Sequence, residues 1–204
     1  IGQANRGLLF VDEIGKLPKT AQHALIQAAQ EEIVTPSKSR ETFPVDFLLV
    51  ATTNPRDEEF ICGAVRDRMV SVSIPHVSLD DEIRIVRKEV SKTGNPVYIP
   101  ALFLRLAAVV VRALRADERL ELGPRASINA ALIAQSSAAF EGRTCVSWCD
   151  IKEGIYTAIL GKARHEDVSE VERLIDEAFP VPEAYLSEHL NLSDMKNIVA
   201  WHRE

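Results

Sequence analysis

The sequence predicts an α/β domain, then an all-α region and a short helical tail. Two unbroken apolar runs, residues 8–11 and 47–51, are typical of strands in a parallel sheet. From about residue 77 the apolar residues recur with helical periodicity instead. We therefore divide the 204 residues into three regions, residues 1–76, 77–165 and 166–204.

The first predicted strand ends in two adjacent carboxylates, Asp12 and Glu13, and its continuous apolar run indicates that it is buried. Ligands of open α/β sheets bind beyond the carboxyl ends of the strands. One carboxylate there can hold Mg²⁺ through its waters, and a second can orient or deprotonate a water. This is the Walker B arrangement of a P-loop NTPase. Two acids that merely end a strand and cap the next turn are the alternative interpretation.

A helix is expected from about residue 20 to residue 32, because small apolar residues recur there at helical spacing. The stripe consists of Ala21, Ala24, Leu25 and Ala28. Short β-type segments around a polar tip then predict a hairpin between residues 33 and 44. Lys38 and Arg40 at its tip could contact a substrate, and a solvated turn is the alternative.

Polar and charged side chains flank the next two predicted strands. Asn54 follows the strand at residues 47–51, where an amide can hydrogen-bond a γ-phosphate or an attacking water. A third strand is predicted at residues 70–74, and Arg66 and Arg68 precede it. A fixed guanidinium near a nucleotide stabilises charge on a transferring phosphoryl group.

Four helices are expected in the second region. Ser78 can cap the first of them, whose opening turn is acidic, as the helix dipole favours. The other three are expected at about residues 100–116, 124–140 and 148–162. Pro124 suits a first helical position, so Arg125 lies where the dipole disfavours a cation. Because local rules are most often broken at functional sites, Arg125 is a candidate γ-phosphate contact; a solvent-exposed arginine is the alternative.

The third region is acidic. Apolar residues between Val168 and Ala178 predict an amphipathic helix, and Ser193 can cap a short last one. The apolar stripe either packs on its own domain or docks a partner.

Composition excludes several classes of protein. With 46% hydrophobic and 26% charged residues, the chain is typical of a soluble globular protein. No apolar run reaches the length of a membrane span and no leader pattern opens the sequence, so we expect a cytoplasmic protein. With a net charge of −6, the chain as a whole has no basic footprint for a nucleic acid, which argues against nucleic-acid binding. The three cysteines have no zinc-ligand pattern and are expected to be reduced.

These motifs, taken in order, resemble the MoxR-type AAA+ ATPases, a group that includes the magnesium chelatase I subunit. Residues 4–14 resemble the Walker B region, and residues 50–55 resemble sensor 1. Asp67-Arg68-Met69 is similar to the family's Asp-Arg-Phe, and residues 123–127 to its sensor 2 segment. The resemblance covers about residues 1–165. It implies the C-terminal part of a RecA-like AAA+ core followed by an all-α AAA+ lid.

The resemblance also implies cofactors and roles. ATP and Mg²⁺ would be the cofactors, with Asp12 holding the metal and Glu13 polarising the attacking water. Asn54 would position that water or sense the γ-phosphate. Arg68 would be the arginine finger that reaches a neighbouring subunit's nucleotide, with Arg66 as the alternative.

Arg125 would contact the nucleotide of its own subunit from the lid. A finger that acts in trans implies a homo-oligomeric ring, in this family usually a hexamer, which remodels or assembles a partner protein. The sequence departs from the family at Met69, where the family has phenylalanine, and at Gly15-Lys16, where it more often has Asn-Arg.

The family's phosphate loop, G-x-x-x-x-G-K-[ST], does not occur in this sequence. Because that loop lies upstream of Walker B in the family, we expect the chain to be the C-terminal part of a longer ATPase and inactive alone. Two alternatives remain. One is a nucleotide-free interaction module built on an AAA+ remnant, and the other is a DNA-acting relative such as a helicase.

Overall fold

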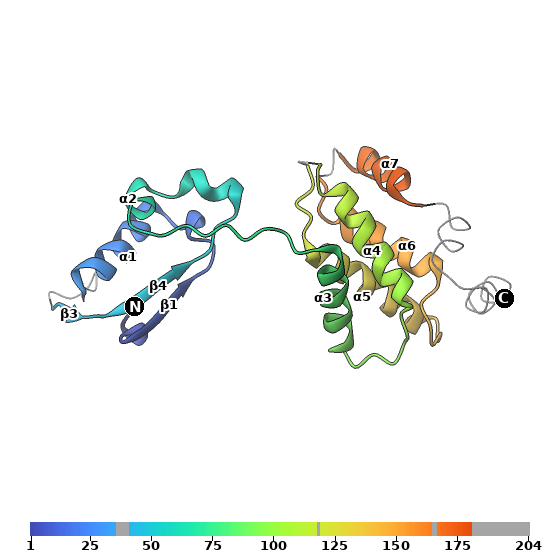
Figure 1. The fold of residues 1–204 in the computed structure, drawn as a ribbon, viewed down its shortest axis with the longest axis horizontal. Helices are drawn as coiled ribbons and strands as arrows, with labels where there is room; N and C mark the ends of the chain where they lie inside the picture. The colour runs from blue at the N-terminus through green and yellow to red at the C-terminus, as the bar shows by residue number, and fades with distance from the viewer. Residues whose placement is uncertain (36–40, 118, 165–166, 181–204) are drawn as a thin grey trace. The chain divides into compact units, whose positions relative to one another are not determined.

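The computed structural model describes residues 1–35, 41–117, 119–164 and 167–180 of the 204. The chain divides into two compact units, Ile1–Ile74 and Pro75–Glu204 (Figure 1). The division into three regions made from the sequence stays a prediction. Within the described ranges, no helix is both long enough and apolar enough to cross a membrane.

The first unit is built on a two-stranded parallel sheet (Figure 1). β1 (Gly7–Val11) pairs with β4 (Phe47–Ala51), so both predicted strands form and end at the same edge. α1 (Lys19–Glu31) lies against one face, where Ala28 and Ala29 pack with apolar residues of both strands. The remaining helical segments of this unit are short: η1 (Gly2–Ala4), η2 (Ile14–Lys16), η3 (Pro55–Phe60) and α2 (Gly63–Arg66).

The other face of this sheet is exposed. Leu8 and Phe10 of β1 are 54% and 56% accessible, and Leu48 of β4 is 64% accessible. Successive side chains of a strand point to opposite faces, and the described residues supply an apolar layer on one face only. The prediction that the first strand is buried is therefore wrong for this face.

The predicted hairpin forms, whereas the predicted third strand does not. β2 (Ile33–Val34) pairs antiparallel with β3 (Phe43–Pro44); Lys38 and Arg40 lie outside the described residues. Residues 70–74 are not a strand, and Val70, Val72 and Ile74 are 92%, 79% and 89% exposed. A strand needs a neighbour for its backbone hydrogen bonds, and no described segment pairs with this one.

The second unit is helical, as predicted. Its helices are α3 (Leu79–Ser91), α4 (Ala101–Leu114), α5 (Pro124–Phe140), α6 (Trp148–Leu160) and α7 (Val168–Ala178). Ser78 Oγ accepts a hydrogen bond from the Asp81 amide at 3.1 Å, which confirms the predicted cap. Val171 and Ile175 of α7 are fully buried in the same core as the other helices. The helix predicted after Ser193 lies outside the described residues.

α5 and α6 approach each other closely. α5 presents a buried row of small residues, which are Ala126, Ala130, Ala131, Ala134 and Ala138. A Cβ atom on Gly154 of α6 would lie 2.3 Å from the carbonyl oxygen of Ala130 and 3.2 Å from the amide nitrogen of Ala134. The interhelical distance therefore depends on the absence of a side chain at residue 154.

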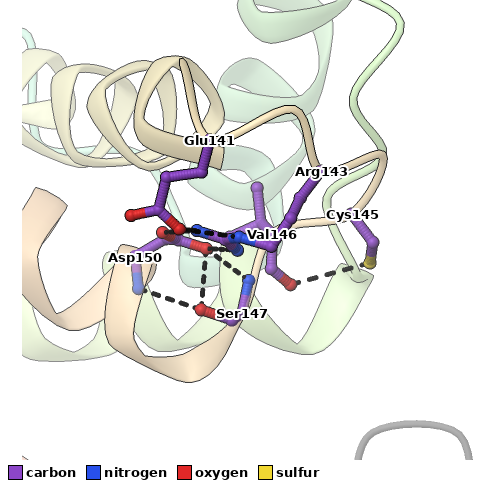
Figure 2. Close-up of polar contacts among 6 residues, drawn as sticks. All are labelled: Glu141, Arg143, Cys145, Val146, Ser147 and Asp150. Atoms are coloured by element: carbon purple, nitrogen blue, oxygen red, sulfur yellow. Dashed lines mark hydrogen bonds and ion pairs between the residues drawn. The ribbon is translucent and has the colours of Figure 1, made fainter. Parts of the chain in front are cut away.

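Asp150 holds the start of α6 and the loop before it (Figure 2). Its carboxylate accepts hydrogen bonds from the Ser147 amide and from Arg143 Nη2, both at 2.7 Å, and Ser147 Oγ accepts from the Asp150 amide at 3.3 Å. Burial acts to raise the pKa of Asp150, but the hydrogen bonds from Arg143 and Ser147 outweigh it and lower that pKa below its ordinary value.

Replacing Asp150 by asparagine is expected to destabilise the protein at pH 7, by an amount that shrinks in acid. A carboxyl group whose pKa is lowered by folding stabilises the protein above its unfolded pKa of about 3.9, and that stabilisation is lost as the pH falls through the folded pKa. Urea unfolding from pH 7 towards pH 2 measures the difference. Glu141→Gln is the control, because Glu141 bonds the same arginine from an exposed position. A pH-independent difference would contradict the prediction.

Candidate active site at the ends of two parallel strands

Three of the predicted residues, Asp12, Glu13 and Asn54, lie together beyond the ends of β1 and β4. Thr52 joins the first two: its hydroxyl donates to Asp12 Oδ1 at 2.5 Å and accepts from the Glu13 amide at 2.9 Å. Asn54 Nδ2 donates to Glu13 Oε1 at 3.2 Å. The parallel register explains this arrangement, because Val11 is opposite Ala51 and the next residues leave the sheet side by side.

The backbone turns sharply at Glu13, which has a φ of 52° in the left-handed region. A non-glycine residue there costs on the order of 1 kcal/mol, and such strained residues cluster at functional sites. The Ile14 amide donates to the Thr52 carbonyl at 2.9 Å, which helps to hold the turn. The turn places Glu13 where its carboxylate accepts the hydrogen bond from Asn54.

Lys16 is a charged neighbour of the site that the sequence argument did not identify. Its Nζ lies 2.7 Å from Glu13 Oε2, in an ion pair whose two side chains are both well exposed. An exposed pair of this kind contributes at most ~1 kcal/mol to stability. The signal for this ion pair in the sequence is the spacing of three residues between Glu13 and Lys16.

Gly15 and Gln22 hold the segment that carries Asn54. A Cβ atom on Gly15 would lie 2.6 Å from the Asp57 carbonyl oxygen, so glycine allows η2 to contact η3. Gln22 of α1 is fully buried; its Nε2 donates to the Phe60 carbonyl at 3.2 Å and its Oε1 accepts from the Cys62 amide at 2.8 Å. The close approach of Asp57 gives a structural reason for the glycine at residue 15.

The two candidate finger residues are held away from the acids by their own contacts. Arg66 Nη2 donates to the Glu58 carbonyl. Arg68 Nε donates to Gln30 Oε1 at 2.9 Å, and its Nη1 donates to the Ala64 carbonyl at 3.2 Å. Both arginines are exposed, and neither bonds to Asp12, Glu13 or Asn54.

Arg125 lies in the first turn of α5, in the second unit, with Pro124 as the first residue of that helix. Its side chain is exposed and has no hydrogen-bond or ion-pair partner among the described residues. The geometry leaves the guanidinium available to a ligand, and its contact with a nucleotide stays a prediction.

The donor set at the strand ends fits Mg²⁺. Mg²⁺ is usually held by one or two carboxylates together with waters and substrate phosphates. Asp12 is exposed, and its Oδ2 has no partner among the described residues. No group of three or more His, Cys, Asp or Glu residues that could hold a metal occurs within those residues, and the cysteines are free thiols. Because its Oδ2 has no partner within the described ranges, Asp12 is suited to share a hydrated cation with a ligand.

Two family models match separate parts of the chain. Residues 1–70 match the model of the sigma-54 interaction domain, and residues 112–178 match that of the AAA lid domain. The first match contains Asp12, Glu13, Asn54, Arg66 and Arg68.

Curated relatives match most of this chain. The chaperone MoxR1 of Mycobacterium tuberculosis is 27% identical over 88% of this chain and 55% of its own length. A magnesium-chelatase subunit ChlI homolog of Methanocaldococcus jannaschii is 26% identical over 81% of this chain and 52% of its own length. The archaeal Lon protease of Halobacterium salinarum is 30% identical over 75% of this chain and 25% of its own length. The chain spans about half, or less, of the length of these relatives.

Among solved structures, the RuvB Holliday junction branch migration motor of Thermotoga maritima matches with a TM-score of 0.57. It is 15% identical and covers 90% of this chain and 57% of its own. At that identity the likeness concerns the fold alone. Together with the lid-domain match, it confirms the predicted fold class of a partial RecA-like core followed by a helical lid.

Proposed function

We propose that this chain supplies the Walker B, sensor and lid parts of an enzyme that hydrolyses ATP with Mg²⁺. The premise is that the chain is an AAA+ ATPase sequence similar to the MoxR type. The observation that carries the proposal is the placement of Asp12, Glu13 and Asn54 at adjacent strand ends, joined through Thr52. This combination supplies a metal-binding carboxylate, a base and an amide within one site.

Each side chain has a separate part in the proposed reaction. Asp12 would hold the hydrated Mg²⁺, which would supply positive charge to neutralise the phosphate oxygens. Glu13 accepts the proton of the attacking water, and Asn54 holds the Glu13 carboxylate in place or contacts the γ-phosphate. Thr52 keeps Asp12 and the Glu13 backbone in register.

Hydrolysis also requires an element that cradles the phosphates. This sequence has no G-x-x-x-x-G-K-[ST] motif, and the chain spans about half of the length of its MoxR and chelatase relatives. We place the phosphate-binding loop in another segment of the full natural protein.

The remaining parts of the proposal concern the assembly. Arg68, or Arg66 in its place, reaches the nucleotide of a neighbouring subunit in a homo-oligomeric ring, with a hexamer as the expected state. Arg125 contacts the nucleotide of its own subunit, and lid movement remodels or assembles a partner protein in the cytoplasm. The exposed positions of Arg68 and Arg125 support these roles.

The experiment that tests the proposal measures Mg²⁺-dependent ATP hydrolysis by the full natural protein, after its intact mass in native cells has been determined. We expect turnover that is abolished by chelation of Mg²⁺ and that increases with protein concentration as rings form. A full-mass preparation that neither binds nor hydrolyses ATP would overturn the proposal and favour the nucleotide-free interaction module.

The Arg68→Ala variant is expected to bind ATP normally and to lose about 10³-fold or more of its turnover, as for removal of an arginine finger. Arg84→Ala is the control, since Arg84 is an exposed arginine that pairs with Asp81 on α3. Mixing Arg68→Ala subunits with Glu13→Gln subunits should restore part of the activity, because some interfaces then combine an intact finger with an intact base. Unchanged kinetics, or mixed rings without recovery, would reject a finger that acts in trans.

A further inference from the structure

The second unit contains a carboxylate that is completely shielded from solvent. Glu82 of α3 has an accessibility of 0%. Its Oε1 accepts hydrogen bonds from Ser127 Oγ at 2.8 Å and from Arg115 Nη2 at 3.0 Å, and its Oε2 accepts from Arg112 Nη1 at 3.0 Å. Donors from α4, from the residue that follows it and from α5 therefore converge on one side chain of α3.

A buried charge is tolerated only where opposite charges and hydrogen bonds compensate for its lost hydration. Arg112 and Arg115 provide the charge, and the Ser127 hydroxyl provides a further bond. The network is not arranged for maximal hydrogen bonding, because Arg115 Nε is buried without a partner within the described ranges. Because the donors come from α4, from the residue that follows it and from α5, the network holds these segments against α3 in one arrangement.

The elements that this carboxylate joins are the start of the unit and the start of α5. The same Arg112 Nη1 that bonds Glu82 also donates to the Val77 carbonyl at 2.9 Å. Val77 is the third residue of the second unit, which begins at Pro75. Ser127 lies on the first turns of α5, two residues after Arg125.

We infer that Glu82 is a positioning residue. It couples the first turn of α5, which carries Arg125, to Val77, near the point where the chain enters the second unit. Through Arg112 and Ser127, it makes these two segments parts of one rigid piece. A nucleotide held by Arg125 would then act directly on Val77, at the start of the second unit. The inference rests on the proposed contact between Arg125 and the nucleotide.

Ser127→Ala tests this coupling, because it removes the hydroxyl that reaches Glu82 and leaves both arginines in place. The measurement is amide hydrogen exchange of the full natural protein, with and without a non-hydrolysable ATP analogue, at residues 77–82 and 124–128. In the wild-type protein the analogue should slow exchange in both segments. In Ser127→Ala it should still slow exchange at residues 124–128, with at least a fivefold smaller effect at residues 77–82.

The controls separate coupling from stability and from the proposed function. Glu89→Gln removes a partly exposed acid of the same helix that pairs with Lys92, and it should respond as the wild type does. If Ser127→Ala does not fold, Arg112→Lys serves instead, since one ammonium group replaces a guanidinium that bonds both Val77 and Glu82. A full response at residues 77–82 in a folded variant would overturn the inference alone. A wild-type protein without any response at residues 124–128 would overturn both the inference and the nucleotide contact of Arg125.

Discussion

The Glu13→Gln variant of the full natural protein is expected to bind Mg-ATP with unchanged affinity and to lose about 10²–10⁴-fold in turnover, the usual contribution of a general base. Glutamine keeps the shape of the side chain and the hydrogen bond from Asn54, but it cannot accept the proton of the attacking water. Asp12 and Thr52 are untouched, so the metal position is preserved. Steady-state hydrolysis and equilibrium binding of a fluorescent ATP analogue measure the two quantities.

Two further variants keep this prediction open to contradiction. Glu31→Gln makes the same substitution at an exposed acid of α1 that accepts from Gln27, and its turnover should match the wild type. Lys16→Met removes the ion pair with Glu13 but leaves the carboxylate, so most of the turnover should remain. Normal hydrolysis by Glu13→Gln would remove Glu13 from the mechanism. A loss in Lys16→Met as large as that in Glu13→Gln would assign the effect to the ion pair.

The largest effect on stability is expected for Gly154→Ala. The added Cβ would lie 2.3 Å from the Ala130 carbonyl oxygen, and backbone cannot move aside as the end of a flexible side chain can. Overpacking of this kind costs about 1–3 kcal/mol. The better helix propensity of alanine offsets up to ~1 kcal/mol of that. We therefore expect a net loss of stability and a lower melting temperature, measured by calorimetry.

Gly123→Ala is the matched control. Gly123 precedes α5 with an extended φ of −122°, and no atom lies within 4 Å of a Cβ built there. Its replacement meets no atom, so any loss of stability reflects only the N-cap preference for glycine over alanine, about 1 kcal/mol or less. Equal melting temperatures for Gly154→Ala and the wild type would show that α5 and α6 can separate without cost.

Most of the candidate site could be predicted from the sequence, because its signals are local. An apolar run stopped by Asp12 and Glu13, and a second run followed by Asn54, locate polar groups at strand ends. The role of Thr52 could not be predicted in this way. Thr52 and Thr53 look alike in the sequence, and only the register of β1 with β4 gives the first of them its contacts with Asp12 and Glu13.

The two wrong predictions concern strands, and both have the same cause. The apolar alternation of residues 70–74 and the apolar run of β1 describe surfaces that can be buried. Whether they are buried depends on neighbouring strands and covering layers, which a local pattern does not contain. In the described structure residues 70–74 have no partner strand, and β1 is covered on one face.

The sequence by itself determined the helices, the cap at Ser78, the proline that begins α5 and the acids at the strand ends, since periodicity and capping act within a few residues. Only the tertiary structure decided which distant residues meet. Glu82 and Ser127 are 45 residues apart, and Gly154 meets Ala130 across two helices. Such contacts follow from how the helices pack, because each depends on the position of a whole element and not on the residues beside it.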